Sequence, residues 1–280
     1  MYELFLTALV EPGDLEAACS VLGGLCSMTP WETISRVVYY QGPSKPTGIS
    51  NQTSIDKPMR KDTALLWKDL HQNLSRQSYI LQARYDVSKQ RDMGPQAVAM
   101  DLNSTPGILR WTDFPDPPHG RPLIIQRKFV DIWEQKKLPC VMRDNQYRYK
   151  SEVMEQQYRF FREETEFCLT RQYFLGSISN YTPLESRQHQ SEPLATLPSW
   201  ESLTPVDMQN RWILHVKVHV LQDSKPDELR KAQDQLTAIK TELEGAFELK
   251  AIDRKAHDTR VALQPQGVQA LPNKVILGKN

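Results

Sequence analysis

Long hydrophobic runs are missing from this sequence. No stretch approaches the about 20 consecutive apolar residues that a membrane-spanning helix needs, so we expect a soluble chain with no membrane contact. Hydrophobic residues make up 39% and charged residues 25% of the 280 residues, which is typical of a globular protein rather than a disordered one. This length fits two ordinary domains or one large all-β barrel.

An excess of either charge is also missing. The chain has 35 basic and 34 acidic residues and a formal net charge of +1. A protein that binds the phosphate backbone of nucleic acid, or an anionic membrane, usually carries a clear basic surplus. We therefore expect no direct contact with nucleic acid.

Paired cysteine motifs are absent. The four cysteines, Cys19, Cys26, Cys140 and Cys168, contain no C-x-x-C spacing. The start of the chain carries Glu3 where an export signal would carry its positive region, so we expect no such signal. A reducing compartment follows as the simpler prediction.

Common catalytic motifs are absent as well. The sequence contains no G-x-x-x-x-G-K-[ST], G-x-G-x-x-G, G-x-S-x-G or H-E-x-x-H. Phosphate-loop, nucleophile-elbow and zincin mechanisms thus have no support. We predict no catalytic residue, no cofactor and no metal, and expect a protein that is not an enzyme.

What is present is alternation of apolar and polar side chains with a period of two. Over residues 147–175 the apolar positions are even before Arg162 and odd after Thr165. A change of parity at the charged corner 162–164 predicts a hairpin of two long β-strands. Similar alternation predicts strands at 2–10, 34–40, 79–87, 108–111, 123–133, 212–220 and 247–252.

Two main helices are expected among these strands. Apolar residues at spacings of three and four predict one helix that Asp14 caps and that ends at Gly23-Gly24 or shortly after, and one of about five turns that ends near Leu243. So many long strands in one sheet favour closure, because closure removes exposed edges. We predict an all-β fold (with α): a single many-stranded antiparallel β-barrel with two flanking helices and long inserted loops.

The predicted domain organisation is simple. One β-barrel domain occupies residues 1–252, and a tail follows over 253–280. Mobile loops are expected at about 41–62 and 176–210, where Pro, Gly, Ser and Gln replace apolar periodicity.

His215 and His219 on the 212–220 strand resemble a metal pair, with Lys217 between them on the same face. However, residues i and i+4 of a strand are about 13 Å apart, too far for one ion held at about 2 Å. A polar face of the sheet is the favoured interpretation.

The acidic cluster Glu163, Glu164 and Glu166 could supply carboxylates to a divalent metal. Because it lies at the predicted hairpin corner, solvated charge is the favoured interpretation.

An apolar stripe on the second helix is the candidate partner interface. Its heptad-like spacing could pack on a partner helix, but two heptads are fewer than a coiled coil usually has, so packing on its own sheet is favoured. The candidate interface residues are Leu229, Leu236, Ile239 and Leu243.

Several strings in this order resemble the fungal form of the Mediator subunit 18 family. The likeness spans most of the chain outside the two long loops and the tail, and it rests on accumulated structural patterns rather than one signature. The strings are YELFLTALVE, LGGLCSM, RVVYYQGP, PTGIS, LHQNLSRQSYILQARYD, WILHVKVHV, DELRKAQDQL and FELKAID.

The resemblance implies a barrel related to the tunnel of RNA triphosphatases and a non-catalytic role in the head module of Mediator, a nuclear transcription coactivator that bridges regulators and RNA polymerase II. It implies a heterodimer with Mediator subunit 20, capture of a C-terminal helix of Mediator subunit 8, contacts with other head subunits, and contact with RNA polymerase II through the complex. It also implies a nuclear location. An exposed apolar barrel mouth or sheet edge is expected, because partners need a docking surface.

The alternative is a metal-dependent phosphohydrolase of the triphosphate-tunnel type. Such enzymes carry E-x-E-x-K on the opening strand, whereas this chain has Glu3, then Phe5, then Thr7 in that register. Phenylalanine cannot ligate a metal ion, so the barrel is expected without that chemistry. A third alternative, a small-ligand carrier, would need a predominantly apolar lumen.

Overall fold

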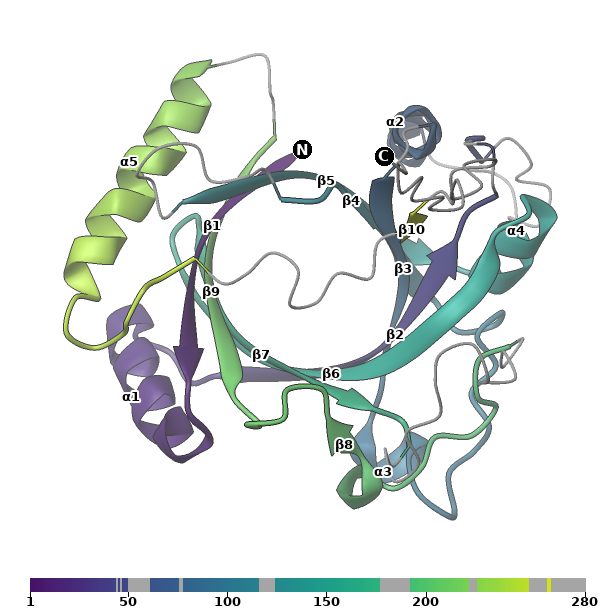
Figure 1. Cartoon of the computed structure of the whole chain (residues 1–280), viewed down its shortest axis with the longest axis horizontal. Helices are drawn as coiled ribbons and strands as arrows, with labels where there is room; N and C mark the ends of the chain where they lie inside the picture. Colours follow the sequence, from purple (N-terminus) through teal and green to yellow (C-terminus); the bar gives the residue numbers. More distant parts are fainter. Residues whose placement is uncertain are drawn as a thin grey trace, which may run out of the picture.

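A computed structural model of the chain describes residues 1–43, 45, 47–49, 61–75, 78–115, 124–176, 192–221, 226–251 and 261–262. Eight antiparallel strands in this part close into a barrel in the order β3-β2-β6-β7-β9-β1-β5-β4, and the pairing of β4 with β3 completes the circle (Figure 1). These strands are β1 (Tyr2–Val10), β2 (Trp31–Gln41), β3 (Ser78–Asp86), β4 (Gly107–Thr112), β5 (Ile125–Gln135), β6 (Arg148–Arg162), β7 (Thr165–Phe174) and β9 (Trp212–Val220). The predicted closed barrel is confirmed.

The predicted hairpin is confirmed at the predicted corner. Strands β6 and β7 pair from Arg162 opposite Thr165 to Val153 opposite Phe174. Glu163 adopts a left-handed φ of 52° at the turn, which explains how two residues suffice to reverse the chain.

Two short strands add to the sheet outside the closed circle. Strand β8 (Thr204–Pro205) pairs with β7, and β10 (Val261–Ala262) pairs with β3. The prediction of a strand over 247–252 is wrong, because the described residues 247–251 form no continuous strand. Within 247–251 there is an isolated bridge from Leu249 to Ala8, and Lys250 donates a backbone hydrogen bond to Thr7.

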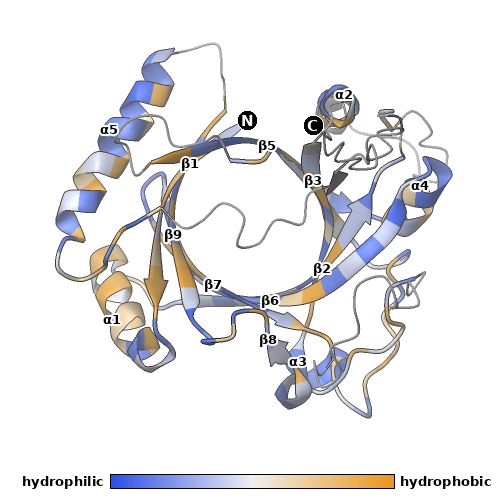
Figure 2. Ribbon diagram, viewed as in Figure 1, coloured by the Kyte–Doolittle hydropathy of each residue, from blue (hydrophilic) through white to orange (hydrophobic). Residues whose placement is uncertain are grey.

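The apolar face of the wall points outward and is covered by helices. On one side, α1 (Leu15–Cys26) packs on β6 and α5 (Pro226–Glu242) lies over β1 and β9, and both helices share a core with Leu4, Phe167 and Val216. Figure 2 shows β1 and β9 largely in hydrophobic colours where α5 lies beside them. This arrangement leaves the opposite, more polar face of each strand for the lumen.

The stripe of α5 packs on the barrel of its own chain. Leu236, Ile239 and Leu243 are buried in the core formed with β1 and β9, and Leu229 packs against that core while partly buried. This is the favoured alternative of the sequence prediction. A partner contact by Leu229, Leu236, Ile239 and Leu243 stays a prediction.

A second core lies beneath two other helices. Helix α2 (Lys61–Leu74) inserts Trp67 and Leu70 over the outer face of β3, β4 and β5, together with α4 (Leu138–Asp144). The sequence indicates α2 as a short helix over 66–74 and gives no sign of α4, whose seven residues are too few to show a helical period.

Short helical turns connect the remaining elements. They are the 3₁₀ turn η1 (Pro12–Asp14), α3 (Lys89–Asp92) and the 3₁₀ turn η2 (Trp200–Ser202). Among the described helices, none is long and apolar enough to cross a membrane.

The described end of the loop expected at 176–210 packs against the outside of the barrel. Leu197 and Leu203 are buried there with Met154 of β6. A buried ion pair holds the segment: Arg36 donates to Glu152 and to the carbonyl of Leu194, whose N–H donates back to Glu152 at 2.8 Å. No local pattern reveals such a contact, because Arg36 lies 116 residues from Glu152 and 158 residues from Leu194.

Much of the remaining loop and tail prediction lies outside the described residues. This holds for 50–60 within the expected loop 41–62, for 177–191 within the expected loop 176–210, and for most of the tail 253–280. The division into a 1–252 domain and a tail stays a prediction.

The ion pair beneath the Leu194 segment predicts an asymmetric mutational effect. Glu152→Ala leaves the fully buried Arg36 charge without its carboxylate, so we expect a loss of about 3–5 kcal/mol in the free energy of unfolding. The double variant Arg36→Met/Glu152→Leu should lose less, because no buried charge is left. Urea unfolding of both variants measures this, and a single variant within about 1 kcal/mol of the natural protein would contradict it.

Candidate functional site

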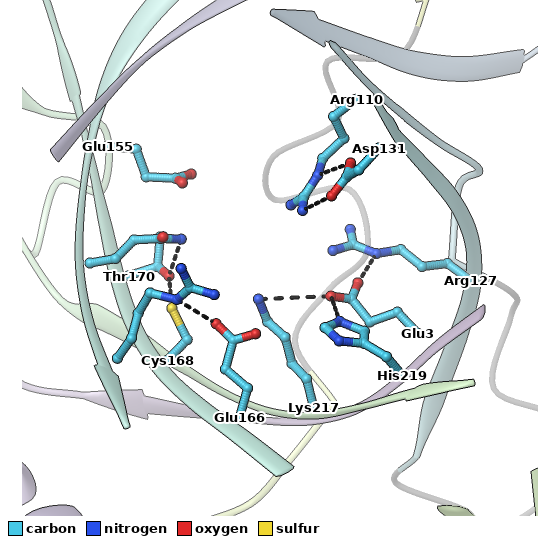
Figure 3. A network of polar contacts seen from close by, with 12 residues as sticks. Glu3, Arg110, Arg127, Asp131, Glu155, Glu166, Cys168, Thr170, Lys217 and His219 are labelled. Atoms are coloured by element: carbon cyan, nitrogen blue, oxygen red, sulfur yellow. Dashed lines mark hydrogen bonds and ion pairs between the residues drawn. The ribbon is translucent and has the colours of Figure 1, made fainter. Parts of the chain in front are cut away.

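The lumen of the barrel is lined by ionisable side chains. Inward positions of the wall carry Glu3 on β1, Lys217 and His219 on β9, and Glu166 on β7, and their side chains extend toward one another in Figure 3. The outward positions between them are apolar and packed against helices. The site is therefore a polar interior within an apolar wall.

Five arginines in and beside this lumen each contact a carboxylate. The guanidinium–carboxylate distances range from 2.5 to 3.0 Å for four of them, and the fifth pair, Arg84 with Glu155, is also in direct contact. The other four pairs are Arg110 with Asp131, Arg127 with Glu3, Arg159 with Glu166, and Arg211 with Asp207.

These pairs connect the strands of the wall around the lumen. Arg110 and Asp131 join β4 to β5, Arg127 and Glu3 join β5 to β1, and Arg159 and Glu166 join β6 to β7. Arg84 of β3 reaches past β2 to Glu155 of β6. The charges thus follow almost the whole circumference of the barrel, and the backbone pairing of β3 with β4 completes it.

Glu3 is the most crowded carboxylate. Arg127 Nε lies 2.5 Å away, His219 Nε2 3.5 Å away and Lys217 Nζ 3.8 Å away. Burial alone would raise the pKa of Glu3, but the positive charges of Arg127 and Lys217 lower it well below its ordinary value. Glu3 is therefore ionised and interacts with several cations at once.

Lys217 stays charged although it is buried. Burial alone would lower its pKa, but the carboxylates of Glu166 and Glu3 raise that pKa above the ordinary lysine value. Its nearest carboxylates are already bound by arginines, Glu3 by Arg127 and Glu166 by Arg159.

His215 lies one inward position from Lys217 and is neutral. Burial, together with the charges of Lys217 and Arg127, lowers the pKa of His215 to about 3. Its Nδ1 is buried and has no hydrogen-bond partner among the described residues. A neutral imidazole with an unused nitrogen thus faces the lumen beside the ring of Phe5, 5.8 Å away.

The structure places the histidine candidates on one polar face, as the alternation predicts, and that face lines the lumen. His219 contacts Glu3, whereas His215 lies beside Phe5. No group of three metal-ligating side chains occurs among the described residues.

The three glutamates of the acidic cluster separate. Glu163 and Glu164 are exposed at the hairpin turn, whereas Glu166 points into the lumen and binds Arg159 at 2.8 Å. Solvated charge was the correct interpretation for the first two and the wrong one for Glu166.

The residues of β1 that align with the E-x-E-x-K motif of tunnel hydrolases face the inside of the barrel. Glu3, Phe5 and Thr7 share the inward face, and Phe5 lies under the guanidinium of Arg127, 5.1 Å from its carbon. The hydroxyl of Thr7 donates to the carbonyl of Lys250 at 2.6 Å. An aromatic ring and a committed hydroxyl therefore stand where a tunnel hydrolase would need a second acid and a lysine.

A cavity of about 290 Å³ occupies the lumen. Its lining includes Arg110, Arg127 and Lys217 as well as apolar side chains such as Phe5 and Ile213. This mixed lining does not match the predominantly apolar lumen that a carrier of uncharged lipophilic ligands needs.

The sequence prediction missed most members of this ring. The missed residues lie on predicted strands, but their alternation with apolar residues is equally typical of charged side chains that face solvent. They are Arg110, Arg127, Asp131 and Glu155. The available signal was that the face opposite each of these residues is apolar, as for Leu109 and Trp111 beside Arg110. Which face is the interior cannot be deduced from alternation alone.

Comparison with known proteins gives consistent results. A model of the Med18 protein family matches residues 2–260. The Mediator of RNA polymerase II transcription subunit 18 of Coccidioides immitis (strain RS) is 24% identical over 162 residues, which cover 58% of this chain and 57% of that protein. The alignment thus spans less than two thirds of that relative.

Solved structures support the fold. A chain of the Schizosaccharomyces pombe Mediator head module is 17% identical, with a TM-score of 0.59, over 89% of this chain and 98% of that one. A Pyrococcus horikoshii protein, 10% identical over 89% of this chain and 94% of that one, has a TM-score of 0.42, too low to support an argument.

The lumen ionisation predicts loss of stability in acid. The pKa values of Glu155 and Glu166 fall to about 2, because arginines and Lys217 outweigh the burial that would raise them. Their stabilisation is complete above the unfolded value and is lost as the pH falls from about 5 toward 2, with about 3 kcal/mol at stake for each. His215, which must remain neutral to stay buried, adds a loss that begins below about pH 6.5.

Urea unfolding between about pH 8 and pH 4 measures this effect. His215→Gln should remove the part of the loss that occurs above about pH 5, because it leaves no imidazole to protonate. A free energy of unfolding that is constant from about pH 7 to pH 4 in the natural protein would contradict the ionisation scheme.

Proposed function

Because this chain belongs to the Med18 protein family, we propose that it is a non-catalytic subunit of the Mediator head module and acts through protein–protein binding. The observation that carries the proposal is the family match over residues 2–260. The fold it shares with a chain of the fission yeast head module supports the same assignment. In this role the protein helps to bridge transcription regulators and RNA polymerase II, in the nucleus.

The proposed partners follow from the family. They are Mediator subunit 20, as a heterodimer, a C-terminal helix of Mediator subunit 8, and other head subunits, with RNA polymerase II reached through the complex. The near-neutral net charge supports partners that are proteins, without direct contact to nucleic acid.

The lumen supports a role that is not enzymatic. Metal-assisted phosphoryl transfer needs carboxylates free to ligate a cation. Here Glu3, Glu155 and Glu166 each bind an arginine, and Phe5 and Thr7 replace the remaining groups of the hydrolase register. The phosphohydrolase alternative is therefore less well supported.

One mouth of the barrel carries exposed apolar side chains, which fits a binding role. Strand pairing places the first residue of β1, Tyr2, at the same mouth as the last residues of β9 and β5. The first residues of β7 and β2 lie at this mouth as well. We call the exposed apolar side chains there the rim: Trp31, Trp133, Phe161 and Leu221, with exposed fractions from 36% to 72%.

The rim resembles a protein-binding surface in its chemistry. The rings of Trp31 and Phe161 lie 6.4 Å apart, and the guanidinium of Arg159 stacks near both. Aromatic and arginine side chains are enriched where few contacts supply most of the binding energy. The rim is therefore our candidate contact for a head-module partner, whereas a contact through Leu229, Leu236, Ile239 and Leu243 would require α5 to leave the barrel.

Co-expression with Mediator subunits 20 and 8 of the same organism tests the proposal. We expect a ternary complex that stays together during size-exclusion chromatography. The double variant Trp31→Ser/Phe161→Ser should weaken the complex by at least about tenfold, since tryptophans at such contacts commonly contribute about 2 kcal/mol or more.

Met208→Ser is the matched control. Met208 is fully exposed in the turn before β9, at the opposite mouth, so its loss should leave the complex intact. Recovery of the natural chain as a monomer that ignores both subunits would contradict the proposed function. A complex unaffected by the rim variant would reject the rim and leave the function standing.

A further inference from the structure

The described part of the lumen has more positive charges than carboxylates to neutralise them. Five arginines in and beside it are matched by five carboxylates, and Lys217 is a further cation. Arg171, which also lines the cavity, donates to Asn210 and lies over the ring of Trp212. The contact of Lys217 to Glu3 spans 3.8 Å, while Arg127 lies 2.5 Å from the same carboxylate. Lys217 therefore shares an acid that already has a closer partner.

The cations also retain unused donors. Among the described residues, Arg127 donates through Nε to Glu3, and Arg110 donates through Nε and Nη2 to Asp131. Figure 3 shows Lys217, Arg127 and Arg110 extending from different parts of the wall toward the centre of the lumen. Several N–H groups therefore converge on the cavity, and no acceptor for them occurs among the residues that the structure describes.

The cavity changes character along its axis. On β9 the inward side chains change from the cation Lys217 through the neutral His215 to apolar Ile213, and on β1 they pass from Glu3 through Phe5. Leu9 lies opposite Ile213 and lines the same part, and beyond it Arg211 and Asp207 form an ion pair with each other. A ligand that fits this gradient has a charged head and an apolar body.

Size and charge limit the ligand further. A volume of about 290 Å³ is near the lower end of small-molecule sites, which begin at about 300 Å³. A polyanion would bring excess negative charge beside the carboxylates of Glu155 and Asp207, which also line the cavity, whereas a single negative charge can be placed against Lys217 and Arg127.

We propose that the lumen binds a small monoanion, a carboxylate with an aromatic or branched apolar body, with its head against Lys217 and Arg127 and its body against Phe5 and Ile213. His215 lines the cavity between these two parts. The proposal concerns the interior of the barrel and does not rest on the assembly of Mediator.

Benzoate is the probe, and its neutral counterpart benzamide is the matched ligand control. Calorimetric titration of the purified full-length protein should detect benzoate binding and no benzamide binding. Lys217→Met should weaken benzoate binding by at least about tenfold, which corresponds to about 1.4 kcal/mol. Lys217→Arg should retain binding, because it keeps the charge.

Lys231→Met controls for nonspecific charge effects, because Lys231 is an exposed lysine on α5 and its loss should change nothing. Absence of benzoate binding to the natural protein, equal binding of benzamide, or unchanged binding by a folded Lys217→Met would each overturn the proposal. Tighter binding of pyrophosphate than of benzoate would also overturn it, because it would mark a polyanion site. Since the comparison of benzoate with benzamide needs no variant, a variant that fails to fold cannot leave the proposal undecided.

Discussion

The contact between Glu3 and Arg127 is the interaction on which the rest of the barrel interior depends. Strand β1 lies between β5 and β9, and the carboxylate of Glu3 reaches cations on both neighbours. A buried carboxylate is stable only where positive charge and hydrogen bonds compensate its desolvation. The ring of arginine–carboxylate pairs continues this principle around the lumen, so opposite charges occupy the space that apolar side chains fill in most small barrels.

The polar interior explains why the helices are essential to the fold. With the charged face of each strand turned inward, the apolar face points out and would be exposed without a cover. Helix α5 covers β1 and β9, α1 covers part of β6, and α2 and α4 cover β3, β4 and β5. The exposed apolar side chains of the rim lie at one mouth, outside this helical cover.

Local pattern was sufficient to predict the eight strands of the barrel and the two main helices, but not their orientation. The hairpin at Arg162 and the helix that carries Leu236 follow from parity and spacing alone, and the structure has both. Alternation groups Lys217 with His215 and His219 on one face, yet the lumen is defined only when β4 pairs with β3. Glu166 was predicted to be solvated because its partner Arg159 is known only once the register of β6 and β7 is known. The contact of Arg36 with Leu194 was not predicted because it connects segments 158 residues apart.

A double-mutant cycle between Glu3 and Lys217 tests the charge balance most directly. Glu3→Gln alone should cost about 3–5 kcal/mol in the free energy of unfolding, because Arg127 and Lys217 then face each other without their shared carboxylate. Adding Lys217→Met should restore part of that loss, with a coupling energy of about 1–3 kcal/mol. Effects that add to within about 0.5 kcal/mol would contradict the account, because the two side chains would then be independent.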